Sequence, residues 1–222
     1  FPPEKFFIVG RKRAFINDYQ SFKLLEQEIL KRSKSGDVIF INLRLSYYFG
    51  EDWYDSPVQD FRFFDQEGNV IKRNSKKYHF KKWLGTLQKF VKDLSKKNVK
   101  VVIFKPTPEF PFARSEKCKE QVQQWFNKYS RLSCSYDLDF FISKGGKYYK
   151  IIEELIEISS RNSNLYLFDS LNVLCPNSEC NYSLNGNILY NDSDHLSNYS
   201  ARYIIAPKIL NFLNDEKIID IN

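Results

Sequence analysis

The sequence lacks methionine, long apolar runs and any abundance of glycine or proline. Gly and Pro number 8 each among 222 residues, so the chain is neither collagen-like nor made mostly of linker. No apolar run approaches the roughly 18 residues that would span a bilayer. The first residues, FPPEKFF, have no basic leader, apolar stretch or small-residue cleavage site, so we do not expect them to be a signal peptide. Because Phe1 stands where an initiator methionine would, we expect the sequence to begin in mid-chain.

The sequence is rich in apolar and aromatic residues. Hydrophobic residues make up 42% of the chain and aromatic residues 17%, which is enough for a sizeable core and excludes general disorder. The formal net charge of +7 is a mild bias for this length and does not indicate a dedicated nucleic-acid binder. Residues 72–80 (KRNSKKYHF) are basic with aromatics interleaved, but a solvated loop that enters a helix explains them better. We therefore predict no nucleic-acid partner.

The four cysteines, at positions 118, 134, 175 and 180, indicate disulfide chemistry. Cys175 and Cys180 lie in a polar, turn-rich stretch where a free thiol would be exposed. Zinc would need a second pair at ligand spacing, and the only histidines are His79 and His195, so we predict no metal. We favour a Cys175–Cys180 bond that fixes the approach to His195, and hence an oxidising compartment. The other two cysteines are a second candidate pair, and four reduced, buried thiols are the alternative.

Short apolar runs alternate along the chain with segments whose apolar residues recur at helical spacing. This alternation predicts an α/β fold with a mainly parallel sheet, formed by one domain over residues 1–222. The expected strands cover residues 6–9, 37–43, 99–104 and 165–169. The expected helices cover about residues 22–30, 80–94, 122–129, 148–158 and 201–214.

The segments that follow the strands are where an open α/β sheet binds its ligands. The most informative of them contains Asp192 and His195, three residues apart in a polar loop before the last helix. A carboxylate at this spacing on a turn can accept a hydrogen bond from the imidazole Nδ1–H, which leaves Nε2 free to act as a base. The alternative is a surface histidine flanked by helix-capping residues.

Three stretches of the sequence resemble one family. The C-terminal stretch contains Cys175-Pro176, Cys180 and residues 185–197 (NGNILYNDSDHLS). The second is residues 101–111 (VVIFKPTPEFP) and the third, weaker one is residues 37–44 (DVIFINLR). Together they are similar to the SGNH/GDSL-type domain that is fused to multi-pass membrane acyltransferases, which O-acylate cell-surface polysaccharides. The similarity extends from about residue 36 to about residue 210, most of the chain.

The resemblance implies a three-layer, flavodoxin-like α/β fold and acyl transfer to a glycan hydroxyl through an acyl-serine intermediate. It implies that His195 is the general base, that Asp192 orients it, and that Arg44 contacts the substrate or the oxyanion. The acyl donor, delivered by a membrane acyltransferase domain, is a substrate, so no cofactor is implied. The domain would lie on the extracytoplasmic side, attached to the membrane in the parent protein.

One departure from the family concerns the nucleophile. The family has its serine in a G-D-S block after the first strand, whereas Gly36-Asp37-Val38 has only the first two letters and precedes a strand. Ser143 is not a candidate because no strand-to-helix turn surrounds it. We expect the nucleophile strand to lie upstream of residue 1. The alternatives are a non-catalytic, glycan-binding homologue and a carbohydrate esterase of the same fold.

Overall fold

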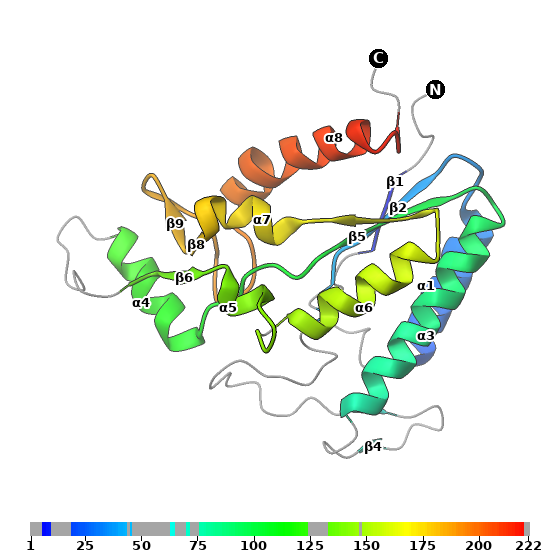
Figure 1. Ribbon diagram of the computed structural model, residues 1–222, viewed down its shortest axis with the longest axis horizontal. Coiled ribbons are helices and arrows are strands. Elements are labelled where there is room, and N and C mark those ends of the chain that lie inside the picture. Colours follow the sequence, from blue (N-terminus) through cyan, green and yellow to red (C-terminus); the bar gives the residue numbers. More distant parts are fainter. Residues whose placement is uncertain are drawn as a thin grey trace.

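A parallel sheet of four strands forms the centre of the molecule (Figure 1). The computed structural model describes residues 6–9, 19–43, 45, 63–64, 70–71, 76–123, 133–146 and 148–219. In spatial order the strands are β1 (Phe6–Val9), β2 (Val38–Ile41), β5 (Lys100–Phe104) and β7 (Leu165–Phe168). All three pairings are parallel, with Ile39 opposite Val101 and Ile103 opposite Leu167. The prediction of an α/β fold with a mainly parallel sheet is therefore confirmed.

The two middle strands are apolar on both faces because the sheet is covered on both sides. Alternate side chains of a strand point to opposite faces, so Ile39 and Val101 join one core cluster while Val38 and Val102 join another. All four of these side chains are fully buried. The continuous apolar runs in the sequence thus correspond to strands between two layers of helices.

Three helices cover one face of the sheet (Figure 1). They are α1 (Tyr19–Arg32), α3 (Lys76–Ser95) and α6 (Tyr149–Ser160). The apolar residues that repeat along α3 at helical spacing are buried against the sheet: Trp83, Leu84, Leu87, Phe90, Val91 and Leu94. α3 begins four residues before the predicted helix, because Lys76 to His79 extend it by one polar turn.

The opposite face is covered by the C-terminal helical segment, η3 (Ser200–Ile205) followed by α8 (Ala206–Asp215). η3 is a π-helix, in which the Ala206 N–H donates to the Ala201 carbonyl. Pro207 follows directly. A proline has no backbone N–H to donate, and in an α-helix its ring crowds the carbonyl four residues earlier. In the π-helix each hydrogen bond reaches back five residues and not four, so the carbonyls before Pro207 follow a different hydrogen-bond pattern from those of an α-helix. The two helical layers and the sheet make three layers.

The smaller elements include the segments beyond the carboxyl ends of the sheet strands. They comprise β3 (Phe63–Phe64), β4 (Val70–Ile71), α4 (Phe112–Gln123), β6 (Ser135–Asp137), α5 (Asp139–Ile142), α7 (Ser170–Leu174), η2 (Pro176–Ser178), β8 (Glu179–Asn181), β9 (Ser183–Leu184) and β10 (Asn187–Ile188). β6 pairs with β8 and β9 pairs with β10, both antiparallel. α4 begins ten residues before the helix predicted near 122–129, and residues 124–132 lie outside the described part of the chain.

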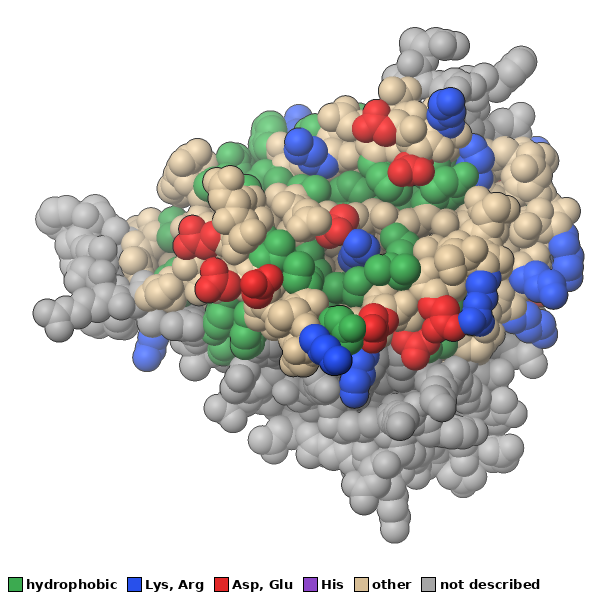
Figure 2. Space-filling model, in the orientation of Figure 1, with side chains coloured by type: hydrophobic (Ala, Val, Ile, Leu, Met, Phe, Trp, Pro, Cys, Tyr) green, Lys and Arg blue, Asp and Glu red, His purple; other side chains and the backbone are tan. Residues whose placement is uncertain are grey.

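Basic side chains gather at the end of the molecule where α3 ends (Figure 2). The exposed ones near the ends of α1 and α3 are Lys31, Arg32, Lys34, Lys89, Lys92, Lys96 and Lys97. Two acidic neighbours, Glu28 and Asp93, form ion pairs with Arg32 and Lys96. This end is the amino edge of the sheet, opposite to the edge where the strands lead into the post-strand loops.

Candidate active site

Two of the segments that follow the sheet strands meet at the carboxyl edge of the sheet. The loop after β5, residues 105–111, runs beside the turn formed by residues 191–195. The Phe110 N–H donates to the Ser193 carbonyl at 2.7 Å. The parallel sheet explains this meeting, because the carboxyl ends of its strands all lie along one edge.

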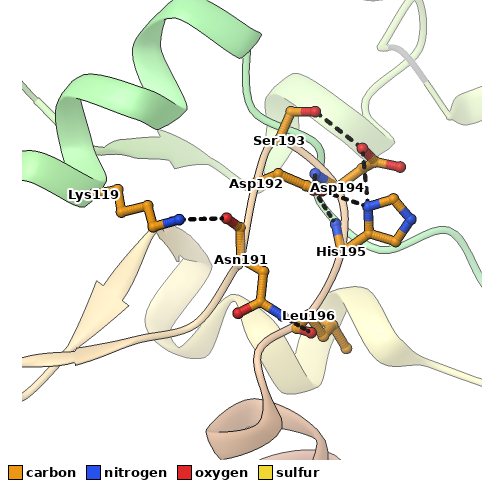
Figure 3. Close-up of polar contacts among 7 residues, drawn as sticks. All are labelled: Lys119, Asn191, Asp192, Ser193, Asp194, His195 and Leu196. Carbon is orange, nitrogen blue, oxygen red and sulfur yellow. Dashed lines mark hydrogen bonds and ion pairs between the residues drawn. The ribbon is translucent and has the colours of Figure 1, made fainter.

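Asp192 and His195 are in direct contact on this turn (Figure 3). The His195 Nδ1 lies 2.7 Å from the Asp192 Oδ2. The other carboxylate oxygen, Oδ1, accepts the backbone N–H groups of His195 at 2.8 Å and Asp194 at 3.0 Å. The aspartate therefore fixes both the backbone of the turn and the imidazole ring. With the proton on Nδ1, Nε2 is unprotonated and is the nitrogen that can accept a proton from a hydroxyl.

The carboxylate of Asp192 is held in its ionised form. Partial burial alone would raise the pKa of Asp192, but the N–H groups of Asp194 and His195 and the imidazole hold this pKa below its ordinary value. The side chains of Asp192 and His195 are 39% and 47% exposed, so solvent and substrate can reach the imidazole. The pair combines a fixed, charged partner with an accessible ring.

The backbone closes the turn into a small antiparallel loop. Tyr190 and Leu196 form a β-bridge, and the Asn191 N–H donates to the His195 carbonyl at 2.8 Å. The Asn191 side chain also donates to the Leu196 carbonyl at 3.3 Å. After the turn, the Ser197 hydroxyl donates to the Ile188 carbonyl at 2.6 Å. These bonds fix both arms of the turn.

A cluster of aromatic residues lies beside the turn. Phe110 contacts Tyr182 and Tyr190 edge-on, with ring centroids 5.3 and 5.0 Å away, and the two tyrosines stack on each other at 5.8 Å. Within the described part of the chain, neither tyrosine hydroxyl has a hydrogen-bond partner. Burial, together with the carboxylates of Glu116 and Asp192, raises the pKa of Tyr182 to about 12. Burial raises the pKa of Tyr190 still further.

The structure contains two disulfides, Cys175–Cys180 and Cys118–Cys134, so the predicted Cys175–Cys180 bond is confirmed. The expectation that these two sulfurs would be exposed is wrong, because Cys175 and Cys180 are at most 2% exposed. They belong to the core cluster on the α3 and α6 side of the sheet. The bond beside the His195 turn is the other one, since Cys118 packs with Tyr182 and Tyr190.

The remaining site predictions have different outcomes. Arg44 lies outside the described residues, so its substrate-binding role stays a prediction. Sequence reasoning missed Glu109, a carboxylate only 3% exposed in the loop after β5, next to the residue that bonds the turn. It also missed Asp194, whose Oδ1 accepts the Ser193 hydroxyl and lies 3.8 Å from the imidazole Nδ1. For Glu109, an acidic residue in a proline-rich post-strand loop was the available signal.

The turn also brings together three potential metal ligands. Asp192, Asp194 and His195 each offer a ligand atom, and these atoms lie within 4.8 Å of one another. However, the imidazole Nδ1 and both oxygens of Asp192 are engaged in the hydrogen bonds of the turn. The arrangement serves to orient the imidazole, and the prediction of no metal stays untested.

The sequence of the chain also shows its family. Residues 1–207 match the family model of the SGNH domain that is fused to AT3 domains. The chain belongs to this family. Membership makes it an SGNH domain of the hydrolase and acyltransferase type, with a function connected to acyl groups. No curated protein and no solved structure matches the chain.

The fusion to AT3 domains connects this SGNH family with membrane proteins. Within the described residues of this chain, no helix has the length and apolar character needed to cross a bilayer.

Proposed function

We propose that this SGNH domain transfers an acyl group, acetyl in the first instance, to a hydroxyl of a cell-surface polysaccharide. The observation that carries the proposal is the imidazole of His195, whose Nδ1 lies 2.7 Å from the Asp192 Oδ2 on a closed turn. A histidine in this arrangement is suited to deprotonate a hydroxyl, which is the step that acyl transfer needs twice.

The mechanism uses the same imidazole in both halves of the reaction. In the first half, Nε2 takes the proton of a serine hydroxyl while the serine oxygen attacks the acyl carbonyl of the donor. The resulting imidazolium is stabilised by Asp192 and returns its proton to the leaving group, which leaves an acyl-serine. In the second half, Nε2 deprotonates a glycan hydroxyl, whose oxygen attacks the acyl-serine carbonyl. The imidazolium then returns this proton to the serine oxygen, which leaves as the free hydroxyl. Hydrogen-bond donors would stabilise the oxyanion in each half.

The partners follow from this reaction and from the family. The acceptor is a polysaccharide or another glycan, and the acyl donor is delivered by a membrane acyltransferase domain of the parent protein. The domain then works on the extracytoplasmic side, in the periplasm or at the cell surface, attached to the membrane. Two disulfides in one chain suit such an oxidising compartment. The proposal includes no metal, no cofactor and no nucleic acid.

The test is product analysis with and without a glycan acceptor. The parent protein, which carries the acyltransferase domain, is supplied with an acyl donor and an oligosaccharide, and mass spectrometry follows the mass of the sugar. Addition of acetyl mass to the oligosaccharide, lost in His195→Ala and retained in His79→Ala, supports the proposal. His79 is a suitable control because it is the only other histidine of the chain. Insensitivity to EDTA would agree with the absence of a metal.

A carbohydrate esterase is the second candidate, and one observation favours it. The His195 side chain is 47% exposed, so water can reach the place where an acceptor hydroxyl would be activated. In an esterase, water attacks the acyl-serine and the same imidazole takes its proton. Release of free acetate from an acetylated glycan at an unchanged rate when acceptor is added would favour the esterase. Retention of the domain on glycan with no turnover would indicate a non-catalytic binding homologue.

A further inference from the structure

The turn that carries His195 is supported by contacts from residues distant in the sequence. Phe110 reaches one arm of the turn through its N–H bond to the Ser193 carbonyl. Lys119 reaches the other arm, where its Nζ donates to the Asn191 carbonyl at 3.2 Å. Figure 3 shows Lys119 extending from α4 towards Asn191, while the imidazole points away on the other side of the turn. The lysine thus supports the turn without occupying the space around the ring.

The support that Lys119 provides depends on how firmly α4 itself is held. Among the described side chains of α4, residues 115–123, only Ser115 and Cys118 are buried. A helix with so little buried surface gains little stability from packing. Cys118, however, is fully buried in the aromatic cluster beside the turn and is covalently bound to Cys134.

The disulfide joins α4 to the residue before β6, and a backbone hydrogen bond connects that residue to the chain segment that leads into the turn. The Cys134 carbonyl accepts the Tyr182 N–H at 2.9 Å, and the Tyr182 carbonyl accepts the Leu189 N–H at 2.9 Å. Leu189 directly precedes Tyr190, where the arms of the turn form their β-bridge. The Cys118–Cys134 bond and Lys119 therefore connect α4 to the turn at two separate points.

We propose that Cys118, Cys134 and Lys119 are positioning residues for His195. The disulfide fixes α4, and Lys119 connects α4 to the Asn191 carbonyl. The Asn191 N–H in turn holds the His195 carbonyl. This inference rests on the proposed role of His195 as the base, and it assigns to one of the two disulfides a function beyond stability.

The second disulfide provides a matched comparison. Cys175 and Cys180 are both buried, but they belong to the core cluster on the α3 and α6 side of the sheet, whereas Cys118 belongs to the aromatic cluster beside the turn. If the disulfides only stabilise the fold, removing either bond should leave the imidazole of the folded protein unchanged. If the inference is correct, only removal of the Cys118–Cys134 bond should change the position of the His195 imidazole.

The first experiment records the imidazole by NMR, which needs no turnover. The signal of the Nδ1–H that is hydrogen-bonded to Asp192 is measured in ¹⁵N-labelled protein. We expect C118A/C134A to lose or broaden this signal while C175A/C180A keeps it. Survival of an unchanged signal in folded C118A/C134A, or its equal loss in C175A/C180A, overturns the inference. If C118A/C134A loses the Nδ1–H signal but the unaltered parent protein shows no acyl transfer, the positioning role is supported and the proposed function is not.

The second experiment leaves both disulfides intact, so folding is not at risk. Lys119→Met removes the donor but keeps the length of the side chain, whereas Lys119→Arg keeps a donor. We expect the methionine variant to broaden the Nδ1–H signal and, in the parent protein, to lower kcat for acyl transfer on the order of tenfold, with KM and Tm unchanged. Lys119→Arg should keep both the Nδ1–H signal and kcat close to those of the unaltered protein. Lys117→Met, on an exposed position of the same helix, is the control, and equal behaviour of the two methionine variants would refute the role of Lys119.

Discussion

At the scale of single residues, the proposed reaction depends on which nitrogen of His195 carries the proton. Asp192 settles this, because its Oδ2 accepts from Nδ1 while its Oδ1 is held by two backbone N–H groups. An asparagine in its place would keep one oxygen for the backbone and present an NH₂ group to Nδ1. The imidazole would then favour the tautomer with its proton on Nε2, in which Nε2 cannot act as a base.

The first prediction concerns this pair in the parent protein. His195→Ala should lower acyl transfer by about 100-fold or more, because the proton acceptor is lost. Asp192→Asn should cost less, since a fraction of the imidazole can still take the active tautomer. The double variant should be little worse than His195→Ala alone, because the two residues act as a unit. Initial rates of transfer check this, and losses that add in the double variant would contradict a cooperative pair.

The second prediction concerns the pH dependence of stability that Tyr182, a buried tyrosine beside the turn, should cause. The pKa of Tyr182 is raised to about 12 by burial, by Glu116 and by Asp192. Its value in the unfolded chain is about 10, so its stabilising contribution is complete below about pH 10 and is lost as the pH rises towards 12. Urea denaturation between about pH 9 and about pH 12 should show a falling free energy of unfolding, with a smaller fall in Tyr182→Phe.

The control for this pH series is Tyr203→Phe, because Tyr203 is 61% exposed. Its curve should follow that of the unaltered protein. If the free energy of unfolding of Tyr182→Phe falls with pH as steeply as that of the unaltered protein and of Tyr203→Phe, ionisation of Tyr182 does not cause the alkaline loss of stability.

At the scale of elements, the sequence predicted best where burial determines the residue pattern. β2 and β5 could be predicted because strands covered on both faces are apolar throughout. The apolar face of α3 was equally clear. α4 was placed too late because its first turns are mostly polar, and the Cys118–Cys134 bond and contacts with β10 hold it instead. Such long-range contacts leave little local signal.

The third prediction compares the contributions of the two disulfides to stability. The Cys118–Cys134 bond joins residues 16 apart and the Cys175–Cys180 bond joins residues 5 apart. The longer loop loses more entropy in the unfolded chain, so removal should cost about 3 kcal/mol for the first bond and about 2 kcal/mol for the second. Guanidinium denaturation of the two double-alanine variants measures both free energies. A larger loss for Cys175–Cys180 would show that packing of the sulfurs outweighs loop closure.

At the scale of the whole molecule, the sequence located the candidate site because a parallel sheet has a defined functional edge. Alternating strands and helices predicted the sheet, and the sheet implied that post-strand loops would meet, as Phe110 and Ser193 do. The D-x-x-H spacing predicted which two side chains could touch. The contacts of Lys119 and Cys118 with the turn depend on three-dimensional packing, so no local pattern could reveal them. The division into one domain stays a prediction.

The fourth prediction concerns the nucleophile, which must lie within about 3 Å of Nε2 during the reaction. Three serines of the turn region are engaged elsewhere: Ser193 donates to Asp194, Ser197 to the Ile188 carbonyl and Ser200 to the Leu189 carbonyl. The family's G-D-S block does not occur in the 222 residues. We therefore expect a serine-directed fluorophosphonate to leave the 222-residue chain unlabelled, and p-nitrophenyl acetate to be turned over poorly.

If the parent protein carries a G-D-S block before residue 1, a chain extended to include it should be labelled stoichiometrically at the serine of that block. The label should disappear in His195→Ala, because the imidazole is needed to activate the hydroxyl. Labelling of a serine within residues 1–222 that also depends on His195 would place the nucleophile inside this chain and contradict the expectation of an upstream strand. Absence of labelling in both chains would favour a glycan-binding homologue, in which Asp192 and His195 keep their geometry without a nucleophile to activate.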